Sequence, residues 1–339
     1  MVKTAIVILN WNTKNHLETF LPFLVKYSNL SDVKIIVADN ASTDDSIIFL
    51  KTNYPDIGLI LLDQNYGFAE GYNRALEQVQ SEYYVILNSD IEVTENWLQP
   101  LIGLLETNPE IAVAMPKLKS YYNRNSFEYA GAAGGYIDKY GYPFCRGRIF
   151  EYMEEDMGQY DGCNEIFWAT GACMVIKASI FHQMGGFDPY FFAHQEEIDL
   201  CWRLQHKGYK IFCTSQSVIY HLGGGTLPKS NPYKTYLNIR NNHVLLKKNL
   251  PPKQWLKVYL IRLPLDFLAA LKFLSGSQPG EFWAVFKAHF SFCKYLLKFR
   301  KVLKPESTFR LIYQKSIIFQ YFFLKRIHFS DLKDRDFKD

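Results

Sequence analysis

Asparagine and aspartate side chains recur directly after short apolar runs in the N-terminal part of the chain. Asn10 and Asn12 follow the first run, Asp39 the second, Asn65 the third and Asn88-Ser89-Asp90 the fourth. Each residue alone could simply form a turn or a helix cap, since Asn, Asp and Ser favour both. Ligands of a doubly wound sheet bind outside the carboxyl ends of its strands. The coincidence at four strand ends therefore predicts one binding crevice.

The predicted crevice has no glycine-rich phosphate loop after its first strand. Neither G-x-G-x-x-G nor G-x-x-x-x-G-K stands there, and the turn reads Asn10-Trp11-Asn12. The charge of a bound nucleotide diphosphate must then be neutralised in another way. Asp90 could bind a divalent metal, Mg²⁺ or Mn²⁺, because such ions are held by one or two carboxylates together with phosphate oxygens.

The elements that must position these residues alternate between buried strands and helices, which is typical of βαβ units. The apolar strands show no polar alternation, so we expect a parallel sheet covered on both faces. The expected strands are 4–9, 34–38, 58–62 and 83–87. The expected helices are one from Thr13 to 27, one over 43–52 capped by Ser42, and one over 68–80.

The later part of the chain predicts a boundary. A Gly- and Tyr-rich stretch over 129–147 indicates a long loop or hairpin near the site. Pro251-Pro252 cannot continue a helix, so we divide the chain into a domain over 1–250 and a basic, aromatic-rich extension over 251–339.

Charge separates the same two parts. Residues 1–250 hold 21 basic and 27 acidic side chains, whereas residues 251–339 hold 17 and 7, giving net charges of −6 and +10. The segments 253–273 and 282–301 predict amphipathic helices that lie on an anionic membrane surface, with Trp and Phe at the acyl boundary and Lys and Arg at the head groups. They could also pack on the domain or on a partner subunit, and both interpretations can hold together.

Composition also predicts a location. The six cysteines show no C-x-x-C pair, which fits a reduced compartment, and no uncharged apolar run of about 18 residues exists to span a bilayer. We expect a cytoplasmic protein that is peripheral on the inner face of the cytoplasmic membrane and binds no nucleic acid.

Seven blocks of sequence carry a resemblance to a known family. In order, they are VILNWN, VADNASTDDS, NYGFAEGYNRA, VILNSDIEV, TGACMVIKASIFHQMGGFDPYFF, EEIDLCWRL and YHLGGGT. The chain resembles, over about residues 1–250, the family 2 glycosyltransferases of the GT-A fold, and most closely their rhamnosyltransferase-like branch. The resemblance implies a nucleotide-diphospho-sugar transferase with a Rossmann-like mixed sheet flanked by helices, followed here by a C-terminal helical extension.

The resemblance assigns a donor site. Asp39 would accept a hydrogen bond from the pyrimidine ring, since an ionised carboxylate selects an N–H donor. Capping of the helix near Ser42 is the alternative for Asp39, and helix packing is the alternative for Gly67 and Gly71. The remaining implied donor-binding residues are Asn10, Asn12, Asn65, Gly67, Asn73, Asn88 and Ser89.

The same resemblance assigns the metal. Asn88-Ser89-Asp90 takes the place of the family's D-x-D motif but begins with Asn, which leaves Asp90 as the ligand in that motif. His221 matches the position of a second ligand from the C-terminal side of the fold. A structural histidine, or one that binds the donor phosphate, are the alternatives.

The block EEIDLCWRL implies the catalytic group. Glu197 matches the position of the base that takes a proton from the acceptor hydroxyl, and Glu196 is the second choice. Asp199, Trp202 and Arg203 are expected at the acceptor site, although Asp199 and Arg203, four residues apart, could simply form an ion pair on a helix.

These residues predict an inverting transferase that moves a sugar from a dTDP- or UDP-linked donor to a lipid-linked or polysaccharide acceptor in cell-surface glycan synthesis. A noncatalytic GT-A protein that binds a glycan or nucleotide is one alternative, and a soluble transferase with a small acceptor is another. Glycoside hydrolysis uses paired carboxylates but needs neither a nucleotide site nor a metal, so Asp39 and Asp90 argue against it. The motifs do not distinguish dTDP-rhamnose, UDP-galactose and UDP-N-acetylhexosamine.

Overall fold

The structure is a computed structural model that describes residues 2–223, 231–298 and 311–337. Two expected features lie partly outside the described residues. They are the Gly-Gly-Thr end of the YHLGGGT block, at 224–226, and the last residues of the segment 282–301.

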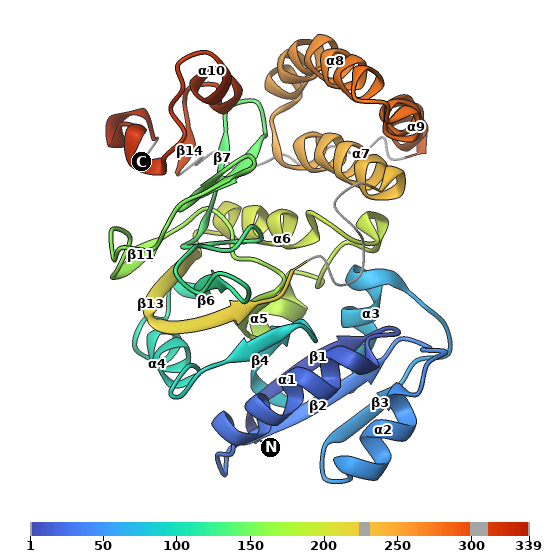
Figure 1. Cartoon of the computed structure of the whole chain (residues 1–339), viewed down its shortest axis with the longest axis vertical. Helices are drawn as coiled ribbons and strands as arrows, with labels where there is room; N and C mark the ends of the chain where they lie inside the picture. Colours follow the sequence, from blue (N-terminus) through green and yellow to red (C-terminus); the bar gives the residue numbers. More distant parts are fainter. Residues whose placement is uncertain (1, 224–230, 299–310, 338–339) are drawn as a thin grey trace.

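A mixed sheet forms the centre of the described chain (Figure 1). Its strand order is β11-β13-β6-β12-β4-β1-β2-β3, and β5 pairs with β13. Strands β4, β1, β2 and β3 are parallel, whereas β12 is antiparallel to both β4 and β6. The strands are β1 Val2–Asn10, β2 Val33–Asp39, β3 Gly58–Leu61, β4 Ser81–Leu87, β5 Ile91–Val93, β6 Ile111–Ser120, β11 Cys163–Glu165, β12 Cys173–Lys177 and β13 Lys210–His221.

Helices cover this sheet and leave its central strands buried along most of their length. This confirms the expectation drawn from their continuous apolar sequences. The register places Asn10 opposite Asp39, so the ends of β1 and β2 lie side by side. The helices are α1 Lys14–Tyr27, α2 Ser46–Asn53, α3 Gly67–Leu76, α4 Gln99–Thr107, α5 Ala178–Gln183 and α6 Glu196–His206.

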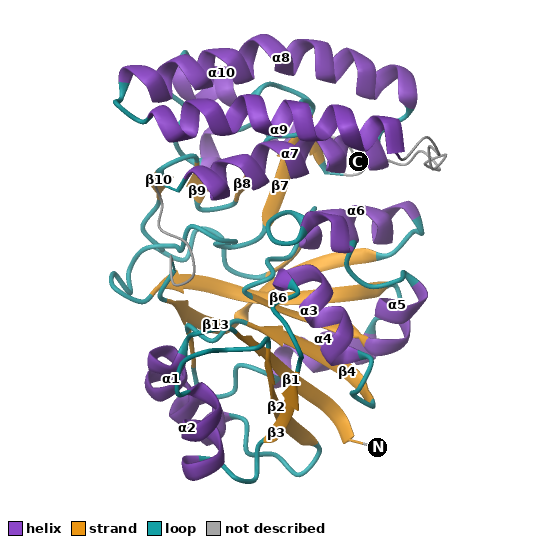
Figure 2. Cartoon of the chain, turned by 90° about the vertical axis from the view of Figure 1, so that its right-hand side faces the viewer, coloured by secondary structure: helices purple, strands orange, loops and turns teal. Residues whose placement is uncertain are grey.

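A smaller sheet lies between the central sheet and the C-terminal helices (Figure 2). The hairpin expected in 129–147 is its centre, with β7 Gly135–Asp138 antiparallel to β8 Pro143–Cys145. Gly135 is required there, because a Cβ atom would lie 2.0 Å from the Trp168 ring. The other strands are β9 Arg148–Ile149, β10 Tyr152–Met153 and β14 Ile312–Tyr313.

The C-terminal helices stack beyond α6 at one end of the molecule (Figures 1 and 2). They are α7 Pro232–Asn249, α8 Pro252–Ser275, α9 Pro279–Lys298 and α10 Ile317–Phe322. Pro251 and Pro252 fall at the break between α7 and α8, but β14 from beyond that break pairs with β7, so a domain boundary there stays a prediction. Within the described ranges, none of the helices combines the length and the apolar character needed to cross a bilayer.

Two helices differ from the sequence-based expectation. Helix α2 begins at Ser46 and not at 43, because the Ser42 hydroxyl does not cap it. Ser42 Oγ instead accepts hydrogen bonds from Asn10 Nδ2 at 3.0 Å and from the backbone N–H of Asn12 at 2.9 Å. Helix α3 ends at Leu76, four residues before the expected end. The predicted cap residue after β2 is thus part of the site.

Candidate active site

Asp39 is held at the end of β2 by two hydrogen bonds. Its Oδ2 accepts from Asn10 Nδ2 at 2.8 Å, and its Oδ1 accepts from the backbone N–H of Ser42 at 2.8 Å. Both Asn10 and Asp39 are almost fully buried. A carboxylate can accept about four hydrogen bonds, so Asp39 can still accept one from a ligand. The Asn10 amide is already bonded and orients the Asp39 carboxylate.

Asn12 joins the turns after β1 and β2. It adopts a left-handed backbone with φ 55°, and its Oδ1 accepts from the backbone N–H of Thr43 at 2.7 Å. Thr13 Oγ1 donates to Asn10 Oδ1 at 2.6 Å and, having one hydrogen only, can accept from Ser89 Oγ at 3.0 Å. These bonds bring the ends of β1, β2 and β4 together, as expected.

The turn before α3 is built by Asn65 and Gly67. Asn65 Oδ1 accepts from the Gly67 backbone N–H at 2.8 Å and from Asn40 Nδ2 at 3.0 Å. Gly67 has φ 73°, and a Cβ atom there would lie 2.5 Å from the Phe192 ring. Close approach to the loop before α6 therefore requires glycine.

Asn73 has a different environment from the one expected. Its amide forms two hydrogen bonds with the backbone of Phe187, donating to the carbonyl at 2.8 Å and accepting from the N–H at 3.0 Å. The side chain thus holds the loop of the GGFD block against α3, and its contact with a donor stays a prediction.

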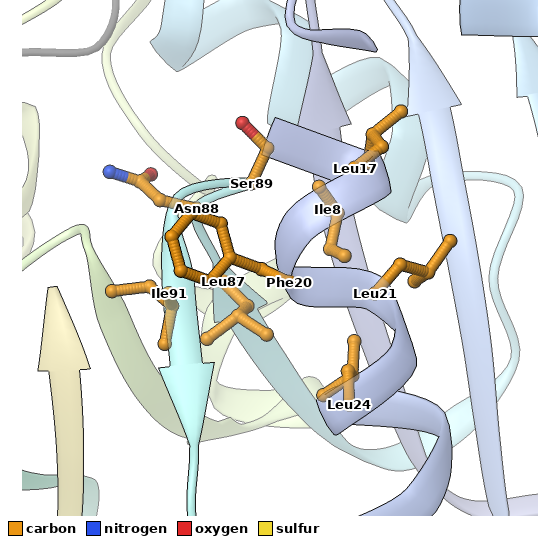
Figure 3. A pocket seen from close by; sticks show the side chains of 9 residues that line it. All are labelled: Ile8, Leu17, Phe20, Leu21, Leu24, Leu87, Asn88, Ser89 and Ile91. Atoms are coloured by element: carbon orange, nitrogen blue, oxygen red, sulfur yellow. The ribbon is translucent and has the colours of Figure 1, made fainter. Parts of the chain in front are cut away.

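Asn88 and Ser89 lie at the end of β4 above a small cavity (Figure 3). The other walls of this cavity are apolar side chains, among them Leu17 and Phe20 of α1. Apart from Asn88 and Ser89, this apolar space next to α1 offers no polar partner for a nucleotide, and the contact of these two residues with a donor stays a prediction.

The structure brings together the two predicted metal ligands. His221 Nε2 at the end of β13 lies 3.2 Å from Asp90 Oδ1, and His221 Nδ1 lies 3.2 Å from Glu128 Oε2. Burial alone would lower the pKa of His221, but the charges of Asp90 and Glu128 outweigh it and raise the pKa well above its usual value. Burial alone would raise the pKa of Asp90, but the charge of His221, the hydrogen bond to His221 and the charge of His16 together lower it.

This arrangement fits a divalent cation. Carboxylate oxygen and imidazole nitrogen suit Mn²⁺, and a metal-bound histidine normally has a carboxylate or carbonyl beside its other ring nitrogen. Glu128 stands in that outer position. No sequence pattern indicated Glu128, because the pairing joins positions 93 residues apart.

Glu196 and Glu197 are the first two residues of α6. Burial raises the pKa of both, to about 7 for Glu197. Neither Oε2 has a hydrogen-bond partner among the described residues. A Cβ atom at Gly171 would lie 3.9 Å from Glu197 Cβ and 3.1 Å from the Phe68 ring, so the glycine leaves room between Glu197 and α3. Only Glu197 of the pair is partly exposed.

The three residues expected at the acceptor site contact other parts of the protein, and their contact with an acceptor stays a prediction. Asp199 and Trp202 are 0% and 2% exposed, and both carboxylate oxygens of Asp199 accept hydrogen bonds from side chains of the protein. Asp199 accepts from Arg203 Nε and Lys248 Nζ, each at 2.8 Å. Arg203 also donates to the Met184 carbonyl at 2.6 Å. Asp199 and Arg203 thus form an ion pair on α6, which agrees with the alternative interpretation.

Helix α7 supplies positioning groups that the sequence did not indicate. Asn241 Nδ2 lies 2.8–2.9 Å from the carbonyl oxygens of Phe191, Ala193 and His194, so its two N–H groups are shared among three acceptors. Arg240 Nη2 donates to the Phe191 carbonyl at 3.0 Å. The loop before Glu196 is thus fixed by a helix that lies about fifty residues later in the chain.

The comparisons with known proteins identify the family. The sequence profile of glycosyl transferase family 2 matches residues 5–185, more than half of the chain. The chain therefore belongs to glycosyl transferase family 2. A solved structure of GalNAc-T7 with UDP, GalNAc and Mn²⁺ superposes with a TM-score of 0.55 at 16% identity, covering 73% of this chain and 48% of that one. This similarity confirms the expected GT-A fold.

Two relatives show the range of named activities. The chain is 25% identical over 225 residues to the O-antigen biosynthesis protein RfbC of Myxococcus xanthus, covering 65% of this chain but only 17% of that protein. It is 24% identical over 239 residues to the N-acetylglucosaminyl-diphospho-decaprenol L-rhamnosyltransferase of Mycobacterium tuberculosis, covering 65% of this chain and 76% of that protein. The expected glycosyltransferase class and its link to glycan biosynthesis are thus supported.

Replacing Asp90 tests the metal site. With Mn²⁺, UDP or dTDP should stabilise the wild type by about 2.7 kcal/mol at roughly 100 times Kd. The Asp90→Ala variant should lose this stabilisation, because the predicted carboxylate ligand of the cation is removed. Thermal unfolding with and without a chelator measures it. The exposed Asp56→Ala serves as control, and equal nucleotide-induced shifts in wild type and Asp90→Ala would remove Asp90 from the site.

Proposed function

We propose that the protein is an inverting, metal-dependent glycosyltransferase that moves a sugar from a dTDP- or UDP-linked donor to a lipid-linked or polysaccharide acceptor in cell-surface glycan synthesis. The observation that carries the proposal is the placement of Asp39, the Asp90–His221 pair and Glu197 around one edge of the sheet. A nucleotide site, a cation site and a base are the three parts that such a reaction needs.

Each group has a defined task. Asp39, oriented by Asn10, accepts the pyrimidine N–H of the donor. Asp90 and His221 would hold the divalent cation, which when bound neutralises the diphosphate. Glu197 accepts the proton of the acceptor hydroxyl. At the same time the hydroxyl oxygen bonds to the anomeric carbon, and the nucleotide diphosphate leaves from the opposite face. Glu197 is favoured over Glu196 because Glu196 is only 3% exposed.

The C-terminal helices support a membrane-bound acceptor. Helix α8 buries two charged residues, Arg262 and Asp266, beside Val258 and Ala270 on its inner face. Its exposed face carries Leu256, Leu260, Leu263, Phe267, Leu268, Leu271 and Leu274. Large exposed apolar patches mark docking surfaces for proteins or membranes.

Charge favours a lipid surface as the partner of this patch. All the Asp and Glu side chains within residues 252–298 are buried, whereas six lysines there are exposed. The ring contacts of Phe267 with Phe286 and of Lys272 with Phe322 join α8 to α9 and α10 in one surface. We therefore place the protein as a peripheral enzyme on the inner face of the cytoplasmic membrane, where lysines meet anionic head groups.

The pH dependence of turnover tests the base. Because burial raises the pKa of Glu197 to about 7, the turnover number should fall as the pH drops below about 7, when the protonated carboxyl cannot accept a proton. The assay measures nucleotide release from dTDP-rhamnose, UDP-galactose and UDP-N-acetylglucosamine with a cell-envelope lipid extract as the acceptor source. Glu197→Gln should still bind nucleotide and Mn²⁺ but lose transfer. Transfer at the wild-type rate by this variant would place the base elsewhere.

Substitutions on the outer face of α8 test the docking surface. The double variant Leu260→Ser/Leu268→Ser should bind anionic vesicles more than about tenfold more weakly, because a buried leucine contributes about 1.5–3 kcal/mol. Cosedimentation with phosphatidylglycerol vesicles measures the binding. Ile48→Ser, an equally exposed site on α2, is the matched control. Unchanged binding by the double variant would favour a soluble transferase.

A further inference from the structure

The inner face of α8 carries a buried arginine, Arg262, that donates four hydrogen bonds. Arg262 Nη1 donates to Asn242 Oδ1 at 2.5 Å and to the Tyr140 carbonyl at 3.1 Å. Its Nε donates to Asp266 Oδ1 at 3.3 Å, and its guanidinium lies 3.8 Å from the centre of the Tyr142 ring. The side chain therefore joins α8 to α7 and to the turn between β7 and β8.

The bond to Asn242 determines which way that amide points. Asn242 Nδ2 donates to Gln195 Oε1 at 2.9 Å and to the Gly141 carbonyl at 2.8 Å. A reversed amide would place its oxygen against these two acceptors and its NH₂ group against the arginine. Because arginine can only donate, Arg262 holds the amide in the orientation that serves Gln195.

Gln195 is the residue immediately before Glu196 and Glu197, and its backbone is strained. Phe192, His194 and Gln195 all have positive φ values, of 64°, 71° and 72°. Non-glycine residues keep such conformations only where the surrounding structure over-determines them. The Asn242 amide is one of the groups that do so for Gln195, and it acts directly at the start of the helix that carries the base.

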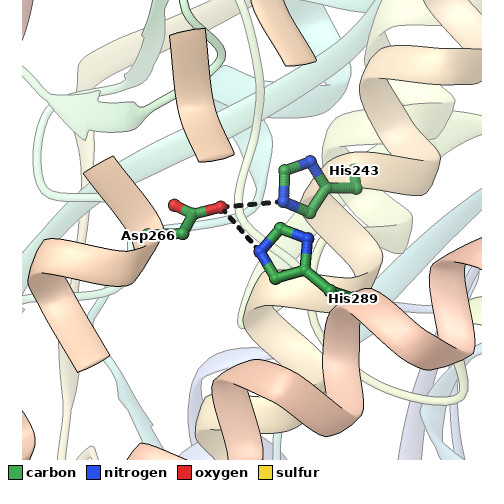
Figure 4. A group of neighbouring side chains, drawn as sticks. All are labelled: His243, Asp266 and His289. Carbon is green, nitrogen blue, oxygen red and sulfur yellow. Dashed lines mark hydrogen bonds and ion pairs between the residues drawn. The ribbon is translucent and has the colours of Figure 1, made fainter. Parts of the chain in front are cut away.

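The other side of Arg262 is anchored by a buried cluster (Figure 4). Asp266 Oδ2 lies 2.8 Å from His243 Nε2 of α7 and 3.3 Å from His289 Nε2 of α9. By residue type this group could bind a transition metal. The Arg262 guanidinium, however, already pairs with the same carboxylate and would put a second positive charge beside a bound cation. The cluster is better explained as the anchor of Arg262.

We propose that Arg262 is a positioning residue for the catalytic base: it orients Asn242, which holds Gln195 and thereby the first turn of α6 with Glu197. This inference rests on the proposed role of Glu197. The C-terminal extension is then a structural part of the active site, although Arg262 itself touches no substrate.

Two variants test the link. Arg262→Lys keeps the charge but lacks the planar fork that reaches Asn242, Tyr140 and Asp266 together. Asn242→Asp is isosteric and keeps an acceptor for Arg262, but it cannot donate to Gln195. Each should lower kcat by up to about 100-fold, since misplacement of a catalytic group by about 1 Å has that effect. The KM for the donor and the binding of UDP or dTDP with Mn²⁺ should stay within about twofold of wild type.

The controls separate this proposal from the proposed function. Arg326→Lys alters an arginine of the same C-terminal region that donates to Gln320, and it should leave kcat unchanged. If the wild type transfers no sugar from the donors named above, or if Glu197→Gln remains active, the proposed function fails. If Glu197→Gln is inactive while folded Asn242→Asp retains wild-type kcat, the positioning role of Arg262 is overturned. The double variant Arg262→Lys/Asn242→Asp gives a further test. If the fold-losses of kcat in the two single variants multiply in the double variant, the positioning role is also overturned, because the free-energy effects of residues that act through one path do not add.

Discussion

Buried backbone groups outside regular structure must find hydrogen-bond partners, and this requirement organises the region around the base. The loop from Pro189 to Gln195 contains only a short 3₁₀ turn over Pro189–Phe191 and has several left-handed residues, so the carbonyls of Phe191 to His194 need partners other than a helix or a sheet ladder. Asn241 takes three of these carbonyls. The Phe192 carbonyl instead accepts from the backbone N–H groups of Phe68 and Ala69, at the start of α3. One irregular loop thus connects the donor side, the base and the C-terminal helices.

The C-terminal region also forms hydrogen bonds with the rest of the protein, so it has a structural role in addition to the proposed membrane contact. Backbone N–H groups from its last part donate to carboxylates of the smaller sheet, as Ile317 does to Asp138 at 2.9 Å and Phe329 does to Glu154 at 2.8 Å. The strong aromatic content of the chain also finds an explanation here. Rings from both sides of Pro251 pack together, with Tyr136 and Phe144 against Phe329. Deleting the extension would expose this packing, so single exposed positions are the informative substitutions.

What the sequence could predict follows from how far apart the interacting residues lie. The strand ends and the convergence of Asn10, Asp39 and Ser89 follow from the fixed geometry of parallel strands, which local patterns reveal. The pairing of Glu128 with His221 and the grip of Asn241 on the loop depend on tertiary packing, which no local pattern encodes. Spacing alone also could not show that Asp199 and Trp202 face inward on α6, because charged residues in the first turn of a helix are usually solvated.

Helix α8 raises the question of why its leucines stay outward when rotation of the helix about its axis would bury them. A hydrophobic inner face would often be as stable as a buried ion pair, so stability alone does not account for Arg262 and Asp266. Buried polar groups can, however, specify a single orientation, because any other rotation leaves charges without partners. Asn242, His243 and His289 accept only one rotation of α8. The contacts that reach toward Glu197, the proposed base, are therefore also the contacts that keep the apolar face of α8 turned outward, toward the proposed lipid surface.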